Sequence, residues 1–294
     1  MSSLPKITVV TPSFNQGHYL EATFKSVLAQ DYPNLEWFVV DGGSKDNSVD
    51  LIRKYEKHFA WWISEKDRNH PHALNKGYER ATGEIFCFVN SDDTLRPGAL
   101  HYVAKKFEQP GTDWVVGWAT YFEDSGDEWE YSVKKTQRPI DWFLHNPVPQ
   151  ISSFWRTDAF KKAGPFTEKF LWGFDYEYWM RLYFVAGYRP TVVKRCLGEF
   201  RLQPNSKTVS KPENYAPDFK GIHEEYSKYL TPHERKLWRR EAKKEQGELK
   251  VMKAWQALKG EGTKAGRAKA LEAVKHQFTS LDAWRVMYCA LRGR

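Results

Sequence analysis

The chain has 294 residues, 16% of them aromatic, and a net charge of +8. This length can bury a sizeable core, and the aromatic content excludes a mainly disordered, solvated chain. The sequence holds no apolar run of the roughly 18 residues that span a membrane and no signal peptide at its N-terminus, so we expect a cytoplasmic protein.

The first 93 residues alternate between strand and helix patterns. Short apolar runs predict strands at 6–12, 35–40, 59–63 and 85–89, and helical spacing predicts helices at 19–28, 46–55 and 73–81. This β-α-β-α-β order predicts a parallel, doubly wound sheet whose strands all end at one edge.

Polar groups follow each predicted strand. They are Thr11-Pro12-Ser13, Asp41, residues 64–68 and Asp92-Asp93. Ligands of open α/β sheets bind at this edge. A glycine-rich dinucleotide fingerprint and a P-loop are both missing from the sequence, which disfavours a nicotinamide cofactor and simple ATPase chemistry.

Asp92 and Asp93 are adjacent carboxylates that repel each other unless a cation lies between them. Mg²⁺ or Mn²⁺ bound in this way normally also holds substrate phosphates. The alternative is structural, because an Asp pair after a strand also caps helices, and Asp41 likewise occurs in ordinary turns between a strand and a helix.

The second half begins with strand patterns at 114–122 and 128–133 and an extended segment at 147–156. A dense aromatic helix is expected at 176–185, with Asp175 and Glu177 at its N-terminal end. The helix dipole favours an ionised carboxylate there, whereas burial raises its pKa, so such a group is suited to act as a general base. The alternative is an Asp that only caps a core helix.

Several motifs in order resemble the family-2 glycosyltransferases of the GT-A fold over about residues 6–208. The motifs are Thr11-Pro12-Ser13-Phe14-Asn15, Val39-Val40-Asp41-Gly42-Gly43-Ser44, Asn75-Lys76-Gly77, Ala81-Thr82-Gly83-Glu84, Asn90-Ser91-Asp92-Asp93, Pro149-Gln150, the stretch 174–182 and the stretch 200–208. The resemblance implies a mixed, mainly parallel α/β sheet flanked by helices, with a helical C-terminal extension. It also implies an inverting, metal-dependent transfer of a sugar from a nucleotide-diphospho-sugar to a glycan or lipid-linked acceptor. A UDP-sugar is the donor expected by default.

The same resemblance assigns roles to single residues. Asp93 is the last acid of a DXD-type motif and would bind Mn²⁺ or Mg²⁺ with Asp92, and Asp175 would be the catalytic base, with Glu177 as the second candidate. Gln203 stands where relatives commonly have a metal- or diphosphate-binding His. It can offer one neutral oxygen, so it is expected to be a metal ligand in a weaker or different metal site. The residues expected to bind the nucleotide-sugar are Thr11, Pro12, Ser13, Asp41, Asp67, Arg68, His72, Asn75, Lys76, Ser91, Asp92, Gln150, Arg201 and Lys207. For His70, a plain loop residue is expected first and contact with the sugar second, whereas a metal site shared with His72 is disfavoured because His-Pro-His is a poor chelate.

The domains are expected at 1–208, the catalytic domain, and 209–294, a basic helical extension. From Asn205 onward the chain has 20 Lys and Arg against 11 Asp and Glu. A final helix would place Leu281, Trp284, Met287, Tyr288 and Leu291 on one stripe, which fits either peripheral contact with an anionic membrane or packing on the catalytic domain or a sister subunit.

Two other classes of protein fit parts of the sequence. A nucleotidyltransferase that makes nucleotide-sugars has a similar sheet, but its loop after the first strand usually contains Arg or Lys, and residues 11–17 do not. A carbohydrate-binding protein without enzymatic activity would use the aromatic residues but would not need Asp92 and Asp93. Nucleic-acid binding is not expected, because no known motif accompanies the basic charge.

Overall fold

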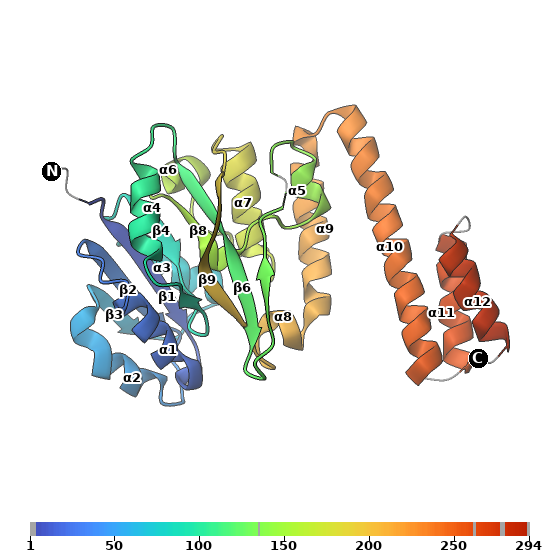
Figure 1. The fold of residues 1–294 in the computed structure, drawn as a ribbon, viewed down its shortest axis with the longest axis horizontal. Helices are drawn as coiled ribbons and strands as arrows, with labels where there is room; N and C mark the ends of the chain where they lie inside the picture. The colour runs from blue at the N-terminus through green and yellow to red at the C-terminus, as the bar shows by residue number, and fades with distance from the viewer. Residues whose placement is uncertain (1–3, 135, 261–262, 277–279, 293–294) are drawn as a thin grey trace. The chain divides into compact units, whose positions relative to one another are not determined.

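The computed structural model describes residues 4–134, 136–260, 263–276 and 280–292, and it divides into two compact units between Tyr229 and Leu230 (Figure 1). The strands are β1 (Ile7–Ser13), β2 (Leu35–Asp41), β3 (Trp61–Ser64), β4 (Ile85–Phe88), β5 (Thr94–Leu95), β6 (Trp114–Glu123), β7 (Glu128–Tyr131), β8 (Ser153–Arg156) and β9 (Thr191–Leu202). The α-helices of the first unit are α1 (Gly17–Leu28), α2 (Ser48–Tyr55), α3 (His70–Tyr78), α4 (Ala99–Phe107), α5 (Asp141–Leu144), α6 (Ala159–Ala163), α7 (Phe174–Phe184), α8 (Lys207–Ser210) and α9 (Tyr215–Tyr226).

The strands form one mixed sheet in the order β3-β2-β1-β4-β8-β6-β9-β5, with β7 paired to β6. The predicted parallel half is confirmed, because β1 pairs in parallel with both β2 and β4, and β2 with β3. Beyond β4 the sheet becomes mixed: β8 is antiparallel to β4 and β6, whereas β6 and β9 are parallel.

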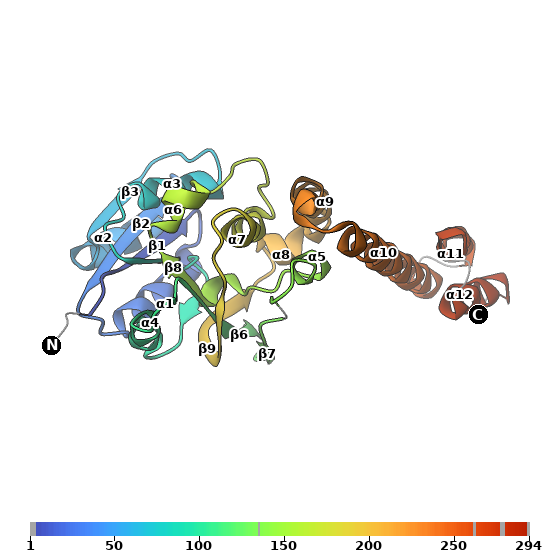
Figure 2. The ribbon, with the colours of Figure 1, turned by 90° about the horizontal axis from the view of Figure 1, so that it is seen from above.

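Both faces of the sheet are covered, as the continuous apolar runs of its central strands require. Figure 2 shows α1 and α4 on one side and α3 and α6 on the other. The first side buries side chains such as Phe24, Trp37 and Leu100 in one core cluster. On the other side, Gly77 of α3 lies so close to β1 that a Cβ atom there would be 2.7 Å from Val10 Cγ1.

The second face also contains an aromatic core that attaches α7 to the sheet. Trp155 of β8 packs against Phe160, Tyr178 and Trp179 at ring-centroid distances of 5.1–6.2 Å. Trp114 of β6 stacks on Trp179 at 5.7 Å. Because these large rings are fully or almost fully buried, they hold the start of α7 in a fixed place relative to the strand ends.

Three features differ from the sequence-based expectations. The helix α3 begins at His70 rather than at residue 73, because Asn69 caps it by accepting a hydrogen bond from the His72 amide at 2.9 Å. The twelve-residue strand β9 was not expected, since its many polar residues hide the strand pattern. The first unit extends to Tyr229, because α9 packs on α7 through pairs such as Tyr176 and Phe219.

The second unit consists of α10 (Pro232–Gly260), α11 (Thr263–His276) and α12 (Leu281–Arg292). The helix α10 begins with a capping box, in which Thr231 Oγ1 accepts from the Glu234 amide and Glu234 accepts from the Thr231 amide. The three helices share a small core of mainly Ala and Val residues. None of the helices in the described residues combines the length and the apolar character needed to cross a bilayer.

Candidate active site

The end of β1 forms the first part of the sheet edge where ligands are expected. Thr11, Pro12 and Ser13 are all buried there. The Thr11 hydroxyl accepts a hydrogen bond from the Trp37 indole at 3.0 Å. The Ser13 hydroxyl, in contrast, has no hydrogen-bond partner among the described residues. Of the three predicted donor-binding residues, Ser13 therefore has a side chain with unused hydrogen-bonding capacity.

Asp41, at the end of β2, is fully buried. Its Oδ1 accepts from Ser44 Oγ at 2.5 Å, and its Oδ2 accepts from Ser64 Oγ at 2.6 Å and from the Gly43 amide at 3.0 Å. These bonds fix the turn after β2, in which Gly43 has a φ of 82°. Contact between Asp41 and a nucleotide base stays a prediction, and the turn itself is held by this carboxylate.

Asp92 and Asp93 lie in the turn after β4, and Asp93 is only 1% exposed. Asp93 Oδ1 accepts from the Arg201 amide of β9 at 3.0 Å, and Oδ2 accepts from Asn90 Nδ2 at 3.1 Å. Burial and the neighbouring charge of Asp92 raise the pKa of Asp93 well above its usual value, and burial also raises the pKa of Asp92. The raised pKa values indicate that the positive charge near the two carboxylates is too small to keep both of them ionised.

A hard divalent cation fits these two carboxylates. The buried Asn90 Oδ1, which has no partner among the described residues, adds a third oxygen beside Asp93. Mg²⁺ is typically bound through one or two carboxylates, with water and substrate phosphates completing its coordination. The donor set of Asp92, Asp93 and Asn90 is of this kind.

Gln203 differs from its predicted role as a metal ligand. Its Oε1 accepts from the Asn205 amide at 2.9 Å, and its Nε2 donates to Asp92 Oδ2 at 3.3 Å. The amide therefore turns its donor group, not its oxygen, toward the carboxylates. In this structure Gln203 positions Asp92 instead of offering an oxygen to a cation.

Asp175 lies in the first turn of α7, where its Oδ1 accepts from the Tyr176 amide at 2.8 Å. Burial raises the pKa of Asp175 to about 6, against the smaller opposing effects of backbone hydrogen bonds and the Lys207 charge. Burial also raises the pKa of the Tyr121 hydroxyl, and the charges of Asp93 and Asp175 both add to this effect. The Phe174 ring, next to Asp175, lies 6.2 Å from the Phe88 ring at the end of β4, so the start of α7 is adjacent to the strand that leads to Asp93.

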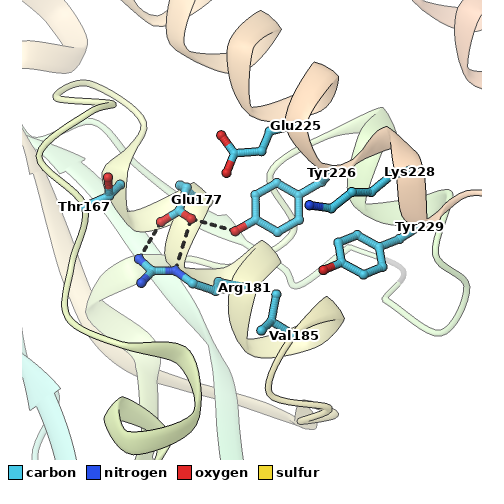
Figure 3. Close-up of a pocket in the computed structure, with 8 residues that line it drawn as sticks. All are labelled: Thr167, Glu177, Arg181, Val185, Glu225, Tyr226, Lys228 and Tyr229. Atoms are coloured by element: carbon cyan, nitrogen blue, oxygen red, sulfur yellow. Dashed lines mark hydrogen bonds and ion pairs between the residues drawn. The ribbon is translucent and has the colours of Figure 1, made fainter.

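Glu177 faces away from these residues, so we correct its assignment as the second candidate base. It lies two positions after Asp175, about 200° around the helix. Its carboxylate accepts from Arg181 at 2.7 and 3.1 Å and from Tyr226 Oη at 2.6 Å. Figure 3 shows these bonds beside a cavity of about 290 Å³. It is lined by residues of α7 and α9 and by Thr167, Val185, Lys228 and Tyr229. The structure thus places Glu177 in a buried ion pair.

The residues predicted around α3 fall into two groups. Lys76 Nζ lies 2.5 Å from Asp67 Oδ1, and His72 Nδ1 lies 3.3 Å from the same oxygen, so these three side chains form one cluster. Arg68 instead pairs with Glu168 at 2.5 Å.

Asn75 also differs from its predicted contact with the donor. Its Nδ2 donates to the Phe166 carbonyl and its Oδ1 accepts from the Phe166 amide, both at 2.9 Å. Its amide is used on both sides to anchor this loop, so we correct its assignment to a structural one.

Gln150 and Ser91 are buried near the end of β4. Gln150 Nε2 donates to the Phe88 carbonyl at 2.7 Å, and its Oε1 accepts from Asn90 Nδ2 at 3.0 Å. Gln150 therefore orients Asn90 and does not itself point at a ligand.

Arg201 and Lys207 bring positive charge to the site. The Arg201 guanidinium pairs with Asp124 and lies over the Phe122 ring at 4.5 Å. Lys207 is coupled by charge to Asp175, while burial lowers its pKa. The positive charge of either side chain is suited to bind a diphosphate. To do so, Arg201 would have to exchange its ion pair with Asp124 for one with the diphosphate.

Asn90 was not singled out from the sequence as a site residue, and for His70 contact with the sugar was only the second expectation. The expectation that His70 is a loop residue was wrong, because it starts α3 and its Nε2 is buried without a partner among the described residues. One signal was available: His70, Ala73, Leu74 and Gly77 follow the i, i+3, i+4, i+7 spacing of a buried helix face.

Known proteins match this chain in sequence and in structure. The pattern of the family described as Glycosyl transferase family 2 matches residues 8–165. An uncharacterized glycosyltransferase of Mycobacterium tuberculosis is 31% identical over 207 residues, which is 68% of this chain and 76% of that protein.

Two solved structures share the fold. TarS 1-349 of S. aureus, in complex with UDP-GlcNAc, has a TM-score of 0.59 and 17% identity over 98% of this chain and 92% of that chain. The mannosyltransferase PcManGT from Pyrobaculum calidifontis, in complex with GDP-Man and Mn²⁺, has a TM-score of 0.56 and 18% identity over 99% of this chain and 86% of that chain. This chain spans 53% of a longer TarS chain. The chain therefore belongs to glycosyl transferase family 2 and is a glycosyltransferase with the GT-A fold.

Proposed function

We propose that this enzyme transfers a sugar, with inversion, from a nucleotide-diphospho-sugar to an acceptor hydroxyl, and that Mn²⁺ or Mg²⁺ assists the reaction. The observation that carries the proposal is that the start of α7, which holds Asp175, packs on the end of β4, which leads to Asp92 and Asp93: the Phe174 ring lies 6.2 Å from the Phe88 ring. It supports an arrangement in which a cation-binding carboxylate and a base share one crevice. The relatives in complex with UDP-GlcNAc and with GDP-Man and Mn²⁺ support the same class of donor.

Asp175 acts as the base. With a pKa of about 6 it is mostly ionised at neutral pH and still basic enough to accept a proton. As the acceptor oxygen bonds to the anomeric carbon, the bond from that carbon to the diphosphate breaks, and the acceptor proton moves to Asp175. Inversion follows because the acceptor and the leaving group are on opposite sides of the sugar.

Asp92 and Asp93, with Asn90 beside them, would hold the divalent cation. When bound, it would neutralise the charge that develops on the leaving diphosphate. Lys207 and Arg201 add side-chain charge for the same diphosphate. The turn held by Asp41, the end of β1 and the cluster of Asp67, His72 and Lys76 bind the nucleoside and its phosphates.

Product analysis distinguishes this function from that of a nucleotidyltransferase. Incubation with UDP-GlcNAc or GDP-mannose and Mn²⁺ is expected to release the nucleoside diphosphate. A nucleotidyltransferase would instead exchange labelled pyrophosphate into the nucleotide-sugar. Exchange without release of the nucleoside diphosphate would refute the proposal.

The acceptor is a glycan or a lipid-linked sugar, and α12 provides a surface for an anionic membrane. Residues 230–294 contain 16 Lys and Arg against 7 Asp and Glu, a net charge of +9. The face of α12 that packs on its own unit consists of Ala283, Val286 and Ala290, and Met287 of the predicted apolar stripe is partly buried against the same core. The other large apolar residues are instead exposed: Leu281 at 75%, Trp284 at 44%, Tyr288 at 53% and Leu291 at 62%. Apolar residues exposed on a basic helix fit the interface of anionic lipids.

Vesicle sedimentation tests this contact with the full chain. The protein is expected to sediment with phosphatidylglycerol vesicles and not with phosphatidylcholine vesicles. Leu281→Ser with Leu291→Ser should reduce sedimentation at least tenfold, whereas Leu271→Ser on α11, at a site 46% exposed, should not. Equal sedimentation of both variants would contradict the proposal. A mass in light scattering that falls from an oligomer to a monomer in the double variant would assign the face to a second copy.

A further inference from the structure

The turn that precedes the base Asp175 is held by a helix far along the chain. The backbone amides of Trp172 and Gly173 both donate to Asp218 Oδ2, at 2.7 and 3.1 Å. Asp218 lies in the first turn of α9, whereas Gly173 is the residue directly before α7. Hydrogen bonds from an amide to a carboxylate are among the stronger ones in proteins. One carboxylate oxygen therefore fixes two consecutive amides just before the helix that carries the base.

The turn has no side chain of its own for this purpose. The residue before a helix is usually Ser, Thr, Asp or Asn, whose side chain accepts hydrogen bonds from the backbone. Here it is Gly173, and no side chain caps the helix at this position. A Cβ atom at Gly173 would lie 3.1 Å from Phe219 Cε1 and 3.1 Å from Ile222 Cδ1, so the close approach of α9 favours glycine. The hydrogen-bond acceptor for the turn comes instead from α9 itself.

Packing on both sides of Asp218 sets its position. The face of α9 that meets α7 has the i, i+3, i+4, i+7 spacing of a packed helix: Tyr215, Asp218, Phe219 and Ile222. The Tyr215 ring meets the Trp172 ring at 5.6 Å, and the Phe219 ring meets the Tyr176 ring at 4.9 Å. A shift of the turn relative to Asp218 would break these aromatic contacts as well as the two hydrogen bonds.

Lys207 connects Asp218 to the base by charge. Its Nζ donates to the Leu171 carbonyl at 3.4 Å, next to the two amides that Asp218 holds. Burial lowers the pKa of Lys207, and the charges of Asp175 and Asp218 both oppose this change. The Lys207 charge in turn favours the ionised form of Asp175. Asp218 therefore has two effects that can be separated, its hydrogen bonds and its charge.

We propose that Asp218 is a positioning residue for the transfer reaction: through its bonds to Trp172 and Gly173 it holds Asp175 in the orientation that takes the proton from the acceptor hydroxyl. The alignment of a base is critical, since a misplacement of about 1 Å can cost about 10²-fold in rate. This inference rests on the proposed role of Asp175 as the base. It also makes α9, which lies beyond the catalytic domain expected at 1–208, a part of the catalytic machinery.

Three substitutions separate hydrogen bonding from charge. Asp218→Ala removes both. Asp218→Asn keeps an oxygen that can accept from the two amides but removes the charge, whereas Asp218→Glu keeps the charge and moves the oxygens by one methylene group. Tyr226→Phe is the matched structural control, because it removes a different bond between α9 and α7, the one from Tyr226 Oη to Glu177 at 2.6 Å (Figure 3).

The assay measures kcat for the release of UDP from UDP-GlcNAc or of GDP from GDP-mannose by the full chain, with Mn²⁺ and with water as the acceptor. Asp218→Ala and Asp218→Glu should each lower kcat about tenfold per folded molecule. Asp218→Asn should recover most of this loss. Tyr226→Phe should melt earlier and keep the kcat of the wild type. Thermal melting measures folding, and if Asp218→Ala does not fold, the contrast between the Glu and Asn variants decides alone.

A double-mutant cycle shows whether Asp218 acts through Asp175. In the Asp175→Asn enzyme the base is gone and its orientation no longer matters. Adding Asp218→Ala, or Asp218→Glu, to that enzyme should therefore leave the residual rate unchanged. An equal loss in both backgrounds would overturn the inference, because Asp218 would then act independently of the base.

Other results would also overturn it. They are a folded Asp218→Ala enzyme with the kcat of the wild type, an Asn variant as slow as the Glu variant, and a Tyr226→Phe enzyme as slow as both. In these cases the proposed function stands if Asp175→Asn is slow. If the wild type releases neither nucleoside diphosphate, or if Asp175→Asn is as active as the wild type, the proposed function fails, and this inference fails with it.

Discussion

Asp175→Asn is expected to slow the enzyme and at the same time to stabilise it. The substitution keeps the shape of the side chain and the oxygen that accepts from the Tyr176 amide, but it removes the base and the buried charge. Loss of a general base typically lowers the rate by about 10²-fold or more. The residual rate should no longer depend on the ionisation of this group.

The pH dependence of the wild type follows from the raised pKa of about 6. Only the ionised form accepts a proton, so activity should rise with pH through about 6. The ionised fraction is about 9% at pH 5 and about 90% at pH 7, which predicts a roughly tenfold change in kcat/KM. A carboxyl group with the ordinary value of 3.8 would give almost no change over this range.

The stability of the folded state should change in the opposite direction. A raised carboxyl pKa means that ionisation of Asp175 costs stability, beginning above the unfolded value near 4 and reaching its full size above about 6. The shift corresponds to at most about 3 kcal/mol, and solvent access to this half-buried side chain reduces it. Asp175→Asn should therefore raise Tm at pH 7.5 and have little effect at pH 4.

Nucleoside diphosphate release between pH 5 and 8, with scanning calorimetry at pH 4 and 7.5, measures both effects. A wild-type rate that is flat over this range, or an Asn variant as active as the wild type, would refute the role of Asp175. A variant that loses activity and also melts earlier at pH 7.5 would show that the side chain is structural.

Three further substitutions test the remaining assignments. Asp93→Ala should lower nucleoside diphosphate release at least 10²-fold and should shift the Mn²⁺ midpoint upward, whereas an unchanged Mn²⁺ titration would exclude this carboxylate as a ligand. Glu177→Gln should destabilise the fold by about 3 kcal/mol because it leaves Arg181 buried without its charge partner; denaturant unfolding measures this, and the rate per folded molecule should stay within about twofold of the wild type. Asn75→Ala should cost about 1–3 kcal/mol by leaving the Phe166 backbone unpaired, with normal KM for a nucleotide-sugar, and a large rise in KM would restore its predicted contact with the donor.

The sequence was sufficient for the parallel half of the sheet, because the continuous apolar runs that end in Asp41 and Asp92-Asp93 are strong local signals. The positions of these acids at one edge followed from strand order alone. The sequence could not indicate how each polar atom is used. Asn75 and Asp67 are both polar residues around α3, yet the loop at Phe166 engages both sides of the Asn75 amide, while Asp67 joins a charged cluster.

Long-range contacts explain the other differences. The partner of Glu177 at Tyr226 comes from a helix 49 residues later, and no local pattern predicts that pairing. Similarly, β9 is recognisable as a strand through its pairing with β6, which is far away in the sequence. The interior position of His70 depends on Phe88 and Phe174, although the helical spacing of its own segment gave a weak indication.

The bond from the Arg201 amide to Asp93 comes from the main chain of β9, so it does not depend on which side chain stands at position 201. Evolution could therefore replace this arginine, and with it the charge offered to a phosphate, without releasing the carboxylate. A backbone anchor of this kind separates two properties that a side-chain anchor would tie together: where the cation is held, and which leaving group is preferred. Libraries that vary position 201 while keeping β9 intact should accordingly change nucleotide preference more readily than metal affinity.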